Sequence, residues 1–206
     1  MRRVEGITLD NLDDLGGRCR SCAFWESTPA EGVDGWTARE LKESWVSETL
    51  LGWGSCGQIL YVDGLPVGHV LYAPPAYVPR AMSFPTAPIS TDAVLLMTAH
   101  IDPEYTGNGL GRILLQGVAR DLTTRGVRAV EAFGRTLPWG PGAGSGCLLP
   151  ADFLRAVGFK TVRPHPVTPR LRMDIRSLVT WREDVESAIE RLLGSISSPV
   201  TAIGGR

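Results

Sequence analysis

The sequence lacks an excess of either charge. Its 206 residues include 21 Lys and Arg against 22 Asp and Glu, interspersed along the chain, for a net charge of −1. Proteins that bind nucleic acids usually carry a basic stripe or a strongly basic domain. The charge pattern therefore argues against nucleic acid as a partner.

Long hydrophobic runs are also missing. The longest uninterrupted apolar run spans Ala93 to Met97, far short of the roughly 20 residues that a membrane-spanning helix needs. The basic residues Arg2 and Arg3 are followed by acidic residues instead of the apolar core of a secretory signal. We therefore expect a cytoplasmic protein with no membrane partner.

Cysteine and histidine are too few and too scattered to predict a metal site. Cys19 and Cys22 form a Cys-x-x-Cys motif, the spacing of half a zinc site or of a redox pair. Cys56 and Cys147 stand alone, no His-x-x-x-His motif supplies a second ligand pair, and the surrounding sequence does not resemble a thioredoxin-like unit. We expect no metal, and thiols that are reduced and partly buried.

Glycine and proline, in contrast, are abundant. The 24 glycines and 15 prolines make up about 19% of the chain, against roughly 12% in an average protein. The other composition is ordinary for a folded domain, with 43% hydrophobic residues. The surplus gathers in a proline segment at 74–90, a short glycine loop at 107–111 and a glycine segment at 134–146.

Hydrophobic periodicity predicts an α/β fold with one mixed sheet flanked by helices. We expect strands at 5–9, 58–62, 66–72, 93–101, 127–133, 160–164 and 170–175, and helices at 37–50, 110–125, 150–157 and 180–193. The helix at 110–125 should join its flanking strands in parallel. The prolines predict a stiff extended loop at 74–90. Residues 1–176 should form one domain, and 177–206 an extra C-terminal helix with a loose tail.

The glycine loop lies between a buried strand and a long helix. It reads Thr106-Gly107-Asn108-Gly109-Leu110-Gly111, and glycines at a helix start leave backbone N–H groups accessible to an anion such as a phosphate. No Gly-Lys-Ser/Thr follows, so it is not a Walker loop, and Arg112 stands where a dinucleotide fingerprint needs its third glycine.

This loop resembles the acyl-CoA pyrophosphate loop of the GCN5-related N-acetyltransferase superfamily, Arg/Gln-x-x-Gly-x-Gly/Ala. Thr106 departs from it by replacing the Arg or Gln. The segment 153–159, Phe-Leu-Arg-Ala-Val-Gly-Phe, is similar to the family's Phe-Tyr-x-x-x-Gly-Phe, and the order of elements from 37 to 175 fits the family's fold.

The resemblance implies acetyl-CoA as co-substrate and direct transfer of its acetyl group to an amine, a small molecule or a peptide. The thioester would lie along the strand edge from Ala99 to Ile101, where a backbone N–H would hold the oxyanion. The pyrophosphate would lie on the loop and helix start, which comprise Gly107, Asn108, Gly109, Leu110, Gly111 and Arg112.

Three side chains are candidates for moving protons. The family's usual acid, the Tyr of its Phe-Tyr helix, is Leu154 here, whereas Cys147 falls where the family often has Asn and is a candidate acid or a small buried residue. Glu131 lies inside an apolar strand, so it is either a catalytic base or the partner of a cation such as Arg. His100 is the rival base or a satisfied structural histidine.

Two functions stay open. The chain is a catalytic N-acetyltransferase, or a CoA-binding regulatory module that kept the fold and lost the chemistry, as Leu154 would favour. The acceptor site should be built from the N-terminal loop around Trp25 and Glu26, the proline segment, and the glycine segment with Trp139. The last helix either seals a homodimer or covers the sheet.

Overall fold

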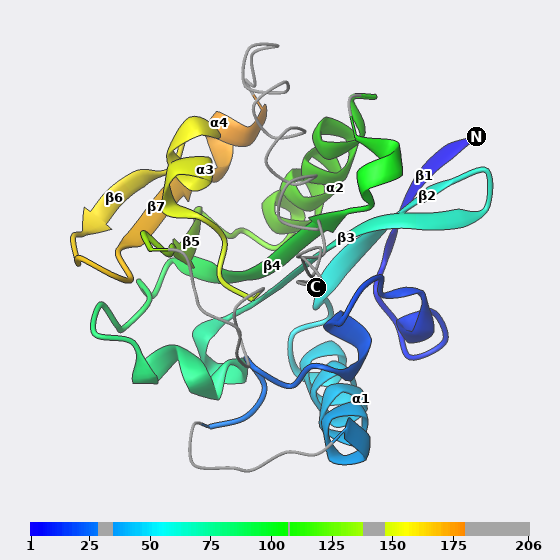
Figure 1. The fold of residues 1–206 in the computed structure, drawn as a ribbon, viewed down its shortest axis with the longest axis horizontal. Coiled ribbons are helices and arrows are strands. Elements are labelled where there is room, and N and C mark those ends of the chain that lie inside the picture. The colour runs from blue at the N-terminus through cyan, green and yellow to red at the C-terminus, as the bar shows by residue number, and fades with distance from the viewer. Residues whose placement is uncertain (29–34, 107, 138–146, 180–206) are drawn as a thin grey trace, which may run out of the picture.

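The computed structural model describes residues 1–28, 35–106, 108–137 and 147–179. Its centre is a seven-stranded sheet in the order β1-β2-β3-β4-β5-β7-β6 (Figure 1). The strands are β1 (Arg2–Gly6), β2 (Gly57–Val62), β3 (Leu65–Ala73), β4 (Ala93–Ile101), β5 (Ala129–Phe133), β6 (Lys160–Arg163) and β7 (Arg170–Asp174). Neighbouring strands are antiparallel except β4 and β5, which run parallel as expected.

Helices cover both faces of this sheet (Figure 1). The helices α2 (Leu110–Thr124), α3 (Ala151–Ala156) and α4 (Ile175–Val179) lie on one face, and α1 (Gly35–Gly52) lies on the other. The long helix α2 is the crossover that joins the parallel strands β4 and β5. Its apolar stripe is buried against the sheet and consists of Leu110, Leu114, Val118 and Leu122. The mixed α/β architecture predicted from the sequence is confirmed.

The core is therefore divided into two apolar layers. The layer under α2 and α3 includes Leu96, Ile101, Leu154 and Phe159. The layer under α1 and the N-terminal loop includes Trp25, Trp45, Met97 and Phe133. Because β4 contributes side chains to both layers, it is buried on both faces, as its continuous apolar run predicts.

Two predicted segments differ from the structure. The first strand covers Arg2–Gly6 instead of 5–9, because the chain turns after Ile7, where the Thr8 amide donates to Asn11 Oδ1 at 2.7 Å. The proline segment is not extended, since it contains 3₁₀ helices at Pro75–Tyr77 and Pro79–Ser83. Each of these helices begins with a proline, whose fixed φ suits a first helical turn. The predicted helix at 180–193, the tail and Trp139 lie outside the described residues.

Candidate acyl-CoA site

The N-terminus of α2 has the backbone geometry that the glycine loop predicts. Gly109 is the residue that caps the helix, and its φ of 71° lies in the left-handed region that favours glycine. Leu110 and Gly111 follow in the first turn, whose amides have no carbonyl partner within a helix. A Cβ at Gly109 would strain the turn that presents these amides. Gly107 lies outside the described residues.

Thr106 does not replace the long donor side chain of the family pattern. Its hydroxyl donates to the Pro103 carbonyl at 2.8 Å. The side-chain amide of Asn108 donates to the Thr106 carbonyl at 3.2 Å. Both side chains therefore bond to the loop's own backbone and help to fix its shape.

A wedge opens between the two parallel strands next to this loop. The ladder between β4 and β5 pairs Ala93 with Ala129, Val94 with Val130, and Leu95 with Glu131. Within the described residues the pairing ends there, and β4 continues to Ile101 with β3 as its ladder partner. The edge of β4 from Leu96 onward is thus available to an extended ligand that reaches in from the start of α2.

A bulge in β4 lies at the point where the wedge begins. Leu71 pairs with Thr98 and Tyr72 with Leu96, so Met97 is an extra residue in β4. A bulge turns a backbone group out of the ladder and re-aims it. It lies two residues before Ala99, at the start of the stretch from Ala99 to Ile101 for which the sequence predicts contact with the thioester.

The helix-side face of the wedge is apolar. A cavity of about 40 Å³ lies between the sheet, α2 and α3, and Leu96, Ala99, Leu149 and Leu154 are among the side chains that line it. Leu154, which occupies the position of the family's acid, is fully buried there. This face can surround an aliphatic chain, but the side chains that line the cavity supply no proton donor.

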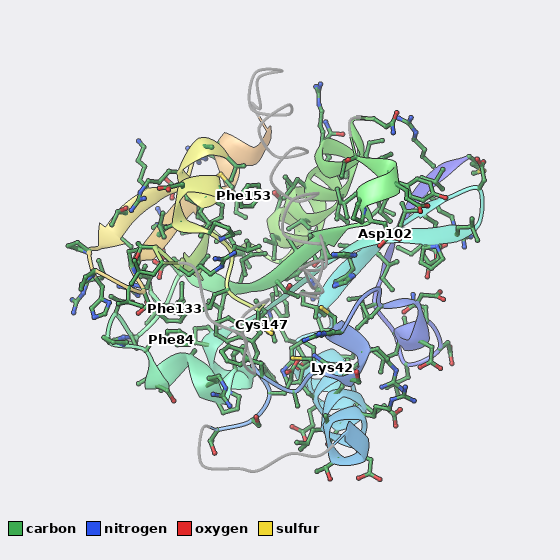
Figure 2. The ribbon with its side chains drawn as sticks, viewed as in Figure 1. Lys42, Phe84, Asp102, Phe133, Cys147 and Phe153 are labelled. Atoms are coloured by element: carbon green, nitrogen blue, oxygen red, sulfur yellow. The ribbon has the colours of Figure 1, made fainter. Side chains whose placement is uncertain are left out.

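The opposite face carries a polar cluster built on three cysteines. The Cys22 and Cys147 sulfurs are 3.4 Å apart although 125 residues separate them in the chain. Cys19 lies beside Cys22 and hydrogen-bonds Thr98, the β4 residue that follows the bulge. Figure 2 shows Cys147 and Lys42 on the α1 side of the sheet, while Phe153 lies on the other side. The cluster therefore lies on the α1 side of the sheet, where the sequence predicts the acceptor site, and we call this side the acceptor face.

The pKa values of the thiols in this cluster are shifted in opposite directions. The hydrogen bond with Cys147 lowers the pKa of Cys22 to about 6, and the nearby Lys42 ammonium adds to the shift. The same hydrogen bond, together with burial, raises the pKa of Cys147. Burial raises the pKa of Cys19 to about 11. The opposite directions of the two shifts favour a thiolate on Cys22 and a proton on Cys147.

A buried ion pair completes the cluster. The Lys42 ammonium contacts Glu26 Oε1, and the two side chains are only 3% and 2% exposed. Sequence reasoning did not single out Lys42. The signal was present, since Lys42 falls on the same face of α1 as Ala38, Trp45 and Thr49, all of which are buried.

His100 lies on the same face, three residues beyond the bulge. Asp102 Oδ1 lies 2.8 Å from its Nε2, which fixes the orientation of the ring. Its ring centroid is 5.4 Å from that of His69. His69 is fully buried, and burial lowers its pKa to about 3, so His69 is neutral. The structure thus brings His100 and the thiol cluster to one face.

Glu131 is not part of this group. Its fully buried carboxylate accepts hydrogen bonds from Arg170 at 2.9 Å, from Arg172 at 3.3 Å and from the Ser90 amide at 3.2 Å. Arginine partners are one of the two alternatives that the sequence leaves open. They come from β7, which pairs Arg172 directly with Glu131. Together with the Arg170 contact to the Pro88 carbonyl, the network ties the proline segment to the sheet.

Aromatic rings form one side of the acceptor face. Phe84 of the proline segment stacks on Phe133 of β5, with centroids 4.3 Å apart and an interplanar angle of 10° (Figure 2). Trp25 stacks on Phe84 at 5.5 Å, and Phe24 meets Trp25 edge-on at 5.0 Å. The N-terminal loop and the proline segment, both predicted to build the acceptor site, therefore share one apolar wall beside the wedge.

The described residues form neither of two other kinds of site. No helix among them is long and apolar enough to cross a membrane. No group of three or more His, Cys, Asp or Glu residues in this part of the chain is arranged to hold a metal ion.

Comparison with known proteins identifies the fold. No protein-family model matches the sequence, and no curated protein matches it. Among solved structures, the PaiA N-acetyltransferase from Thermoplasma acidophilum in complex with coenzyme A is similar, with a TM-score of 0.53 and 12% identity over 84% of this chain and 99% of that one. An N-acetyltransferase from Staphylococcus aureus Mu50 has a TM-score of 0.50 and 14% identity over 85% and 99% of the two chains. The chain therefore has the fold of these N-acetyltransferase structures.

Proposed function

We propose that the protein is an acetyl-CoA-dependent N-acetyltransferase that transfers the acetyl group directly to an amine. The observation that carries the proposal is the wedge between β4 and β5, which begins at the Met97 bulge and opens toward the left-handed Gly109 turn at the start of α2. The similar structure from Thermoplasma acidophilum is a complex with coenzyme A, which supports the same ligand here.

The chain's own backbone supplies the binding groups. The amides from Gly107 to Arg112 would hold the pyrophosphate, as helix N-termini hold anions in general. The edge of β4 would bond the pantetheine amides, and the apolar cavity beside Ala99 would cover its aliphatic part. When bound, acetyl-CoA supplies an activated thioester carbon. A backbone N–H beside the Met97 bulge would stabilise the oxyanion.

Two side chains of the acceptor face are suited to proton transfer. His100, oriented by Asp102, is the base for the attacking amine. His100 lies two residues beyond Thr98, the residue next to the bulge, which is roughly 7 Å along the strand. One water, or the amine itself, can span the distance between the His100 ring and a thioester held beside Thr98. Cys147 retains its proton because its pKa is raised, and it is the candidate acid for the departing CoA thiolate, although the same shift makes it a weak acid. Glu131 takes no part, because its carboxylate is occupied by two arginines and an amide.

A CoA-binding module without catalysis is the second candidate. The observation that favours it is Leu154, which is fully buried in the apolar layer at the position of the family's tyrosine. A module would bind CoA at the same loop and wedge. It would differ only in failing to transfer the acetyl group.

An assay of acetyl transfer separates the transferase from the CoA-binding module. It uses a panel of small amines and peptides and follows the release of free CoA thiol. We expect amine-dependent release above the hydrolytic background. His100→Gln should lower kcat at least tenfold and leave CoA affinity unchanged, while the matched variant His165→Gln, in the loop between β6 and β7, should keep full activity. CoA binding without transfer to any amine would favour the module, and absence of CoA binding would refute both functions.

A further inference from the structure

The acceptor face holds two thiols that are already in contact. Cys22 follows the short 3₁₀ helix at Cys19–Ser21, and Cys147 precedes α3, yet their sulfurs lie 3.4 Å apart. Both residues are partly exposed. A disulfide joins its sulfurs at about 2.05 Å, so these two need to approach by roughly 1.4 Å.

The groups around Cys22 favour its thiolate over that of Cys147. The Phe24 backbone amide and the Lys42 ammonium stabilise the Cys22 thiolate, whereas the Glu26 carboxylate acts against it. The hydrogen bond with Cys147 has the largest effect and outweighs the desolvation that burial causes. A thiolate, and not a thiol, reacts with peroxides and disulfides.

We propose that Cys22 is a peroxide-reactive thiol and that Cys147 resolves its oxidised form into a Cys22–Cys147 disulfide. The Cys22 thiolate attacks one oxygen of a hydroperoxide. The O–O bond breaks, Cys22 becomes a sulfenic acid, and the hydroxide that leaves is neutralised by the proton that Cys22 released to the solvent on ionising. The Cys147 sulfur then attacks the Cys22 sulfur, the S–O bond breaks, and water leaves with the Cys147 proton. The two cysteines together lose two electrons, and one hydrogen peroxide is reduced to two waters.

The other two cysteines are poorer partners for physical reasons. Burial raises the pKa of the Cys19 thiol to about 11, so Cys19 keeps its proton. Cys56 is fully buried between β2 and the N-terminal loop, with its thiol directed at the Ile7 carbonyl. The Cys-x-x-Cys motif is therefore not the redox pair that its spacing suggests. The pair joins one of its cysteines to a residue far along the chain.

Peptide mapping of the intact protein tests the proposal directly. The full chain is treated with one equivalent of hydrogen peroxide, alkylated under denaturing conditions and cleaved with trypsin. Cleavage after Arg20 separates Cys19 from Cys22, so Cys22 falls on peptide 21–39 and Cys147 on peptide 136–155. We expect these two peptides joined, with a mass lower than their sum by two hydrogens, and released again by dithiothreitol. Cys56 should stay alkylated and serves as the internal control.

Two variants resolve the steps. In Cys147→Ser, a 1,3-dione should trap sulfenic acid at Cys22, and in Cys22→Ser neither the adduct nor the cross-link should form. Cys56→Ser should form the cross-link as the wild type does. A disulfide between Cys19 and Cys22, or oxidation of Cys22 no faster than that of Cys56, would overturn the proposal. Because the readout is covalent and requires no acetyl-CoA, its failure is separate from failure of the proposed transferase.

Discussion

Replacing Glu131 with Gln should lower the stability of the protein rather than its chemistry. The substitution keeps the shape of the side chain but removes the charge that Arg170 and Arg172 face from β7. The Arg170 side chain is only 9% exposed, so its guanidinium would be left in the core without its carboxylate. The Ser90 amide would lose part of its charge-assisted hydrogen bond as well.

The size of the expected loss in unfolding free energy follows from the burial of this ion pair. Breaking a buried ion pair by removing one partner costs about 3–5 kcal/mol. Arg172 retains a second partner, since it makes two hydrogen bonds of 2.8 Å to Asp92. We therefore expect the lower end of the range, about 3 kcal/mol, which is roughly a hundredfold change in the unfolding equilibrium.

Urea unfolding followed by tryptophan fluorescence measures this difference. The matched control is Asp152→Asn, which removes an exposed carboxylate 2.7 Å from Arg155 and should cost about 1 kcal/mol or less. Acetyl transfer by the folded fraction of the Glu131 variant should stay near the wild-type rate. If instead stability matches that of the Asp152 variant while kcat collapses, Glu131 is the catalytic base and the structural assignment is wrong.

Two further predictions concern thiol chemistry and packing. Because the pKa of Cys22 is lowered to about 6, its rate of alkylation by iodoacetamide should rise through pH 6 and level off above about pH 7. Cys56, whose pKa is raised to about 12, should stay unreactive at pH 8. A Cys22 rate that still rises steeply at pH 9 would contradict the thiolate. Gly57→Ala should lower the free energy of unfolding in urea by more than about 2 kcal/mol, since a Cβ there would lie 2.3 Å from the Val70 carbonyl oxygen. Gly64→Ala, at a positive φ in open space, should lower it by only about 1–2 kcal/mol. Equal losses in the two variants would refute the close approach at Gly57.

The sequence predicts the parts of the fold that depend on local pattern. Residues 93–101 are apolar without interruption because the strand is buried on both faces, and the stripe of α2 has the 3.6-residue period of a helix packed on a sheet. The proline segment was mispredicted because proline excludes a helix interior but not a first turn.

Contacts between distant segments were beyond local pattern. A glutamate inside an apolar strand indicates that Glu131 needs a partner, which a cation can supply. Only the register of β7 against β5 shows that Arg170 and Arg172 are the partners. Likewise, Cys22 and Cys147 meet only because the N-terminal loop packs on the acceptor face next to the segment before α3. The proposed proton-transfer groups depend on such contacts, whereas the proposed anion-binding loop depends on glycines close together in the sequence.

The most direct test of the central claim is the affinity for CoA, measured by calorimetry, of two variants at the ends of one helix. Gly109 precedes α2 with a φ of 71°, and Gly126 follows it with a φ of 70°. An alanine at either position should cost about 1–2 kcal/mol of stability, because both adopt the left-handed conformation. Only Gly109→Ala should weaken CoA binding, by at least tenfold, while Gly126→Ala should bind as the wild type does. Equal affinities for all three proteins would contradict a phosphate site at the start of α2.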